Sequence, residues 1–186
     1  MFLYHNTLPL DVSQQLDKLE LLMTRIKAQG LDAKKQGLDD LADDCLSKFK
    51  VAQKHYRKLR GEYDVLYFAY EYFSHSKNPE NENNLIPEGV LYENAPNFHQ
   101  ELCGILNELE FNPTKKIGWS VPRGHGKSAY LSNVFPVHQI VYKKRNYVLI
   151  VSETEKMAQR FVEWVGDQLK FNKKLREDFG ELLSPN

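Results

Sequence analysis

The feature that most constrains the fold of this chain is a glycine-rich segment, VPRGHGKS, at residues 121–128. A short strand-like run at residues 116–121 leads into it, and a helical pattern of apolar residues follows from Ala129. Further on, residues 147–151 form a continuous apolar run bounded by polar residues, which is typical of a strand buried on both faces. A strand, a turn, a helix and a second strand in this order predict a parallel α/β unit.

The region ahead of this unit has the pattern of helices. Apolar residues recur every three or four positions over residues 12–26 and again over residues 38–59. We expect Gly30 to end the first of these helices, and the short connection that follows favours an antiparallel pair. The hairpin is either an interaction arm for a partner or a cover for the rest of the chain.

A densely aromatic helix is expected at residues 62–73, where core packing is a better explanation than a platform for stacking bases. The predicted organisation is a helical region at 1–75, a polar linker at 76–96 and a third part at 97–186. For the third part we predict the N-terminal portion of a P-loop NTPase domain, with a parallel sheet and flanking helices.

Charge and cysteine content narrow the class of protein. Lys and Arg together number 25 and Asp and Glu also 25, so bulk charge does not indicate a nucleic-acid binder. Basic residues concentrate in 115–176, which suits phosphate or DNA partners and equally suits solvated helix faces. Cys45 and Cys103 lie in apolar helical patterns, so we expect buried thiols in a reducing compartment. Without a signal-peptide pattern or a run of ~20 apolar residues, the chain is expected to be soluble and intracellular.

The glycine-rich segment has the chemistry of a phosphate-binding loop. Gly126, Lys127 and Ser128 fill the last three positions of the pattern G-x-x-x-x-G-K-[ST], and Gly124 and Gly126 allow backbone N–H groups to approach phosphate. Lys127 would contact the β and γ phosphates of ATP, and the Ser128 hydroxyl would bind Mg²⁺. Val121 stands where the pattern has glycine, so an ordinary strand-to-helix turn remains an alternative.

Two other side chains of the loop bear on its role. Arg123 either reaches the γ-phosphate, where it would offset charge in the transition state, or forms a salt bridge to a neighbouring acid. His125 belongs to the expected nucleotide-binding loop, but its side chain is expected to point away from the phosphates and to take no catalytic part.

Three stretches together resemble the N-terminal part of the large subunit of tailed-bacteriophage terminases: NFHQEL at 97–102, the loop at 121–128 and VLIVSETEKMAQ at 148–159. Loops of that family also have an early arginine and no obligatory first glycine. The resemblance implies a motor that uses ATP and Mg²⁺ to drive double-stranded DNA into a procapsid, with a separate domain that cuts the DNA concatemer. It also implies a small terminase subunit and a portal protein as partners, in the host cell cytoplasm.

The resemblance assigns residues to roles. It makes Lys127 and Arg123 the catalytic residues here, Ser128 the Mg²⁺ ligand, and Phe98 and Gln100 weak candidates for contact with adenine. The family also needs an apolar strand that ends in Asp-Glu, and none follows Ser128. We therefore expect an N-terminal fragment that binds ATP weakly and hydrolyses it negligibly, with an exposed strand edge that favours self-association. A helical assembly module and a helicase-like ATPase fragment are the alternatives.

Overall fold

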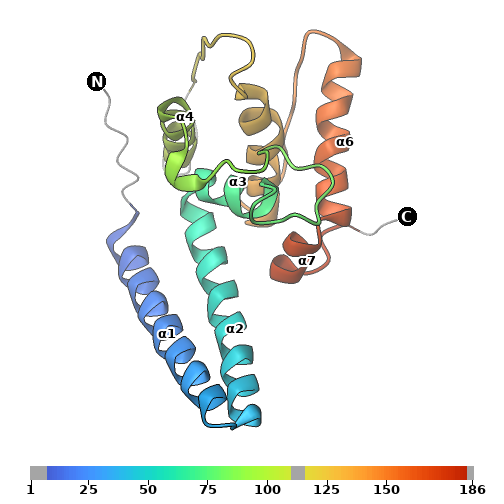
Figure 1. Cartoon of the computed structure of the whole chain (residues 1–186). Helices are drawn as coiled ribbons and strands as arrows, with labels where there is room; N and C mark the ends of the chain where they lie inside the picture. The colour runs from blue at the N-terminus through green and yellow to red at the C-terminus, as the bar shows by residue number, and fades with distance from the viewer. Residues whose placement is uncertain (1–7, 110–115, 184–186) are drawn as a thin grey trace. The chain divides into compact units, whose positions relative to one another are not determined.

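The computed structural model describes residues 8–109 and 116–183, and most of these residues lie in helices. Figure 1 shows the helices in chain order. Their bounds are α1 Leu10–Lys35, α2 Asp39–Tyr63, α3 Val65–Phe73, η1 Tyr92–Asn94, α4 Asn97–Glu108, η2 Ala129–Val134, α5 Phe135–Val141, α6 Glu155–Phe171 and α7 Lys173–Phe179. The η1 element is a 3₁₀ helix and η2 is a π-helix that runs directly into α5.

The predicted parallel α/β fold of a P-loop NTPase is wrong for the part of the chain that the structure describes. Residues 116–121 and 146–152, both expected to be strands, lie outside any strand. The single β-type contact in the described ranges is an isolated parallel bridge between Ser74 and Ile86. A strand persists only when its backbone groups pair with a neighbouring strand, and neither segment has such a neighbour here. The protein, as described, is all-helical.

The chain divides between Tyr63 and Asp64 into two compact units. The first unit is the hairpin of α1 and α2, which lie side by side in Figure 1. Its turn places Gly37 at φ 72°, in the left-handed region that favours glycine. The buried apolar positions come from both helices: Val12, Leu16, Ile26, Ala33, Cys45, Ala52 and Tyr56. Leu38 and Leu41, which the spacing placed on the same stripe, are 48% and 49% exposed.

Gly30 does not end the first helix as predicted, because α1 continues to Lys35. A Cβ atom built on Gly30 would lie 3.1 Å from the Cβ of Cys45 on α2. Glycine is therefore present to let two helix backbones approach, and not to break the helix. A glycine in a helical pattern can either end the helix or allow a second helix to approach, and the sequence alone does not distinguish the two.

The second unit is organised around the aromatic helix α3. Asp64 caps its N-terminus by accepting a hydrogen bond from the Tyr67 N–H at 2.9 Å, and its other carboxylate oxygen accepts from the Tyr92 hydroxyl at 3.0 Å. The ring of Phe68, which is fully buried, lies 4.9 Å from that of Tyr72 and 5.1 Å from that of His138 on α5. The helix is thus a core element, as the sequence indicated. Cys45 and Cys103 are both buried free thiols, which confirms the predicted burial.

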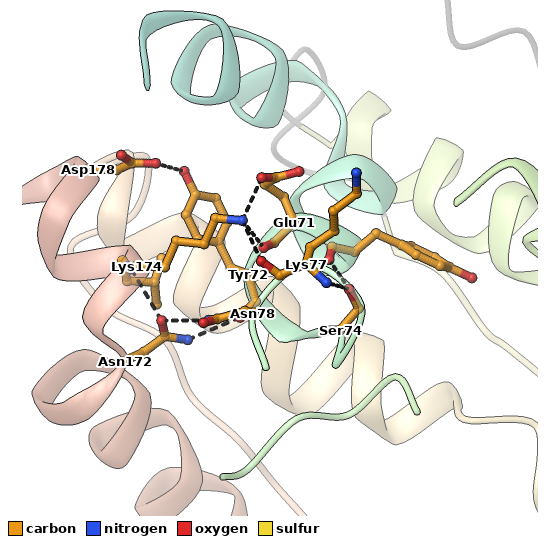
Figure 2. A network of polar contacts seen from close by, with 10 residues as sticks. Glu71, Tyr72, Ser74, Lys77, Asn78, Asn172, Lys174 and Asp178 are labelled. Carbon is orange, nitrogen blue, oxygen red and sulfur yellow. Dashed lines mark hydrogen bonds and ion pairs between the residues drawn. The ribbon is translucent and has the colours of Figure 1, made fainter. Parts of the chain in front are cut away.

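A buried polar network joins α3 and the segment after it to α6 and α7 (Figure 2). Asn78 donates to the Tyr72 carbonyl at 2.9 Å and to the Asn172 side-chain oxygen at 3.0 Å. The Tyr72 hydroxyl donates to Asp178 at 2.7 Å, and Lys174 donates to a Glu71 carboxylate oxygen at 2.6 Å. These contacts fix the C-terminal helices against the aromatic core.

None of the helices in the described ranges combines the length and the apolar character that crossing a membrane requires.

Candidate phosphate-binding loop

The loop at 121–128 ends at the start of a helical run that begins with Lys127 and continues through η2 and α5. Gly124 has φ 85° and Gly126 has φ 70°, so both lie where a side chain would strain the backbone. The Gly126 carbonyl accepts the Ala129 N–H at 3.0 Å and the Tyr130 N–H at 3.4 Å. The first N–H groups of a helix have no partner within the helix, and they carry its positive dipole end. The glycines therefore allow a tight turn that leads directly into the start of a helix.

Two histidines hold this loop in place. The Nε2 atom of His99, on α4, lies 2.9 Å from the His125 carbonyl oxygen, and a carbonyl only accepts, so His99 donates. The Nδ1 atom of His125 likewise donates to the Arg123 carbonyl at 3.1 Å. The His99 ring also lies 4.7 Å from the ring of Tyr130. The loop is thus braced from α4 on one side and by its own histidine on the other.

Close packing makes the first of these contacts depend on Gly126. A Cβ atom added to Gly126 would lie 3.3 Å from Nε2 of His99, tighter than most contacts of real Cβ atoms. At Gly124, by contrast, an added Cβ atom meets nothing within 4 Å. Gly126 is therefore required both by its φ angle and by its neighbour, and Gly124 by its φ angle alone.

The charge around the loop is positive. No Asp or Glu occurs between Lys116 and Arg145, a stretch that contains Arg123 and Lys127. Arg123 is exposed and Lys127 is half-buried, and neither forms an ion pair with another residue in the described part of the chain. The salt-bridge alternative for Arg123 therefore finds no acidic partner among these residues. Both cations are available to an anion at the loop.

The structure separates the two residues that were expected to contact adenine. The Phe98 ring lies 6.2 Å from the His125 ring and 6.0 Å from that of Trp119, so it belongs to the loop's surroundings. Gln100 instead donates its side-chain amide to the Ala95 carbonyl at 2.7 Å, at the start of its own helix. Nothing in the geometry brings Gln100 to the loop.

The residue that sequence reasoning missed is His99. It stands between Phe98 and Gln100, inside the stretch that carries the family resemblance, yet no pattern marked it. Its other ring nitrogen, Nδ1, is buried and has no hydrogen-bond partner among residues 8–109 and 116–183. Only the fold shows that this side chain reaches a loop more than twenty residues further along the chain.

The described residues contain no group of three His, Cys, Asp or Glu side chains that could hold a metal ion. The Ser128 side chain is exposed at the start of the helical run. Mg²⁺ usually enters such sites with the nucleotide, keeping several waters and binding one or two protein oxygens together with phosphate oxygens. The exposed Ser128 hydroxyl fits that mode and would supply one protein oxygen.

Comparison with known proteins gives no match to this chain among protein-family models, curated proteins or solved structures.

Proposed function

We propose that the loop at 121–128 binds the phosphate groups of ATP together with Mg²⁺. The observation that carries the proposal is the pair of left-handed glycines, Gly124 and Gly126, directly before a helix whose first residues are Lys127 and Ser128. Backbone N–H groups at a helix N-terminus, the dipole of the helix and an adjacent lysine are all attractive to phosphate. This local geometry needs no sheet in order to bind an anion.

Each side chain has a distinct part in the proposed site. Lys127 supplies a compact positive charge to the β and γ phosphates, and Arg123 offers a planar set of N–H donors to the γ-phosphate. The Ser128 hydroxyl is the proposed Mg²⁺ ligand. Phe98, beside the loop, offers an apolar face to the base. His99 and His125 hold the backbone in shape from outside the phosphate contacts.

The proposed activity is binding and not hydrolysis. A nucleotide hydrolase needs a residue that orients the attacking water and usually a carboxylate for the metal ion. The segment from Lys116 to Arg145 contains no carboxylate. The resemblance of residues 97–102, 121–128 and 148–159 to terminase large subunits supports the further proposal that the chain is the nucleotide-binding part of a DNA-packaging motor of that class. Double-stranded DNA, a small terminase subunit and a portal protein are the partners that this class implies.

The test is a titration of the whole chain with a fluorescent ATP analogue in the presence of Mg²⁺. We expect Lys127→Ala to weaken binding about tenfold, which corresponds to about 1.4 kcal/mol. The matched control is Lys156→Ala, which removes the same charge from an exposed position on α6 and should leave binding unchanged. Equal affinity of the native chain and the Lys127→Ala variant, with native circular dichroism spectra for both, would rule out the loop as the site.

A second candidate function, as an assembly module, is favoured by a specific feature of the hairpin. Between α1 and α2 lies a hollow of about 490 Å³ whose lining is mostly apolar. Leu22 is 46% exposed and Val51 70% exposed beside it. We infer that the hollow binds the apolar face of an amphipathic helix from a partner protein. Such helices bind in apolar grooves through residues spaced three and four apart.

A further inference from the structure

The apolar segment at 147–151 exposes one of its faces to solvent. Tyr147, Leu149 and Val151 are 79%, 69% and 81% exposed, while Val148, at 37%, and Ile150 between them are less exposed. Alternation with a period of two is the pattern of an extended strand with one face outward. In the described part of the chain, no backbone hydrogen bond joins residues 146–152 to another segment. The segment therefore has both an unpaired backbone and an uncovered apolar face.

The sequence around this segment is complementary to itself when it is reversed about Leu149. In an antiparallel pair of two copies with Leu149 opposite Leu149, Tyr147 faces Val151, an aromatic and β-branched pairing that stabilises sheets. The same register places Arg145 opposite Glu153, so that opposite charges meet at both ends. A parallel register would instead place like residues, and like charges, side by side.

The two charged residues at the ends are placed to take part. Arg145 and Glu153 are both exposed. The guanidinium of Arg145 donates to the Lys144 carbonyl at 2.9 Å and to the Leu109 carbonyl at 3.3 Å. Since a guanidinium has five N–H donors, these contacts hold the group at the start of the segment and leave other N–H groups for a carboxylate.

We propose that residues 145–153 form a homodimer interface, in which the segment pairs antiparallel with the same segment of a second copy about a two-fold axis at Leu149. Such an interface is isologous, so each dimer contains two Arg145–Glu153 pairs and two Tyr147–Val151 pairs. Pairing gives the unpaired backbone groups their partners and covers apolar surface that water otherwise contacts. The proposal is independent of nucleotide binding, because it uses none of the residues of the loop.

The test is sedimentation equilibrium of the whole chain over a range of concentrations. We expect the native chain to dimerise, and Arg145→Glu or Glu153→Arg to raise the dimer Kd about tenfold, since each creates two facing pairs of like charge at a cost of about 1.4 kcal/mol in total. The double variant restores both pairs with their charges exchanged. We expect it to dimerise as the native chain does.

Leu149→Lys places two like charges opposite each other at the axis and should abolish the dimer. Val51→Lys, which alters only the hairpin, is the control and should leave the Kd unchanged. Far-UV circular dichroism of each variant shows that it is folded. A native chain that is monomeric at every concentration overturns the proposal. The proposal is also overturned if the single charge reversals leave the dimer intact, if the double variant fails to restore it, or if Val51→Lys dissociates it.

Discussion

Asn172 shows how much one side chain contributes to the C-terminal half of the molecule. It is 1% exposed and its amide group is fully used: Nδ2 donates to the Tyr72 carbonyl and to Gln168, while Oδ1 accepts from Asn78 and from the Leu175 N–H in the first turn of α7. One residue thus caps a helix and ties it to the aromatic core. Nothing in the sequence distinguishes it from other asparagines of the chain.

Asn172→Ala should lower the free energy of unfolding by about 3 kcal/mol, since it removes a helix cap and leaves buried polar groups without partners. Urea denaturation followed by tryptophan fluorescence measures the change. Asn146→Ala is the matched control, because Asn146 is exposed and its loss should cost less than about 0.5 kcal/mol. If the two variants unfolded at the same urea concentration, the network would have no net stabilising role.

At the scale of helices, the hairpin of α1 and α2 has the second candidate function, which is to bind a helix of a partner protein. A fluorescent helical peptide with a leucine stripe should bind the whole chain, and a peptide of the same composition with a scrambled order should bind at least about tenfold less well. Val51→Lys should remove the difference, because it places a charge in the apolar hollow. Anisotropy titration measures all three affinities.

The hairpin control is Lys50→Ala, next to Val51 but outside the lining of the hollow, which should bind the peptide as the native chain does. Equal binding of the leucine-stripe and scrambled peptides would mean that the hollow has no specificity for a helix. In that event α1 and α2 remain a hairpin without an assembly role, which was the second explanation that the sequence left open.

At the scale of the whole molecule, the buried ionisable groups of the unit that begins at Asp64 include a cysteine and two tyrosines whose pKa values are raised. Cys103 is fully buried, and Tyr70 and Tyr130 are 3% and 4% exposed. Burial, more than any nearby charge, raises the pKa of all three groups, that of the Cys103 thiol well above its ordinary 9.0 and those of the tyrosines above 10.0. In the unfolded chain the same groups ionise at their ordinary values.

Stability should therefore fall as the pH rises above about 9, because the unfolded state then releases protons that the folded state retains. The protonated groups contribute their full stabilisation at pH values below their ordinary pKa values. This stabilisation is lost as the pH rises from the ordinary pKa values towards the raised pKa values of the folded state. Urea midpoints at pH 7, 9 and 10.5 measure the effect. Cys103→Ala should flatten the fall near pH 9. A midpoint constant to pH 10.5 would contradict the prediction.

Periodicity predicted the helices well where they bury a simple stripe. The stripe from Val12 to Ile26 predicted α1, and the aromatic pattern at 62–73 predicted α3. The site was predicted less completely. Gly124 and Gly126 have the positive φ angles expected of a tight turn, while the brace from His99 depends on a contact between α4 and the loop that no local pattern records.

What the sequence by itself determined is therefore local: which residues form amphipathic helices, and where glycine, lysine and serine stand at a helix start. Only the tertiary structure decided which segments of the chain lie against one another. Gly30 lies at a close approach between helices and not at a helix end. The strand-like run at 116–121 and the apolar run at 147–151 have no strand beside them in the described part of the chain. The physical reason is that a helix satisfies its own backbone hydrogen bonds, while a strand needs a second segment to do so.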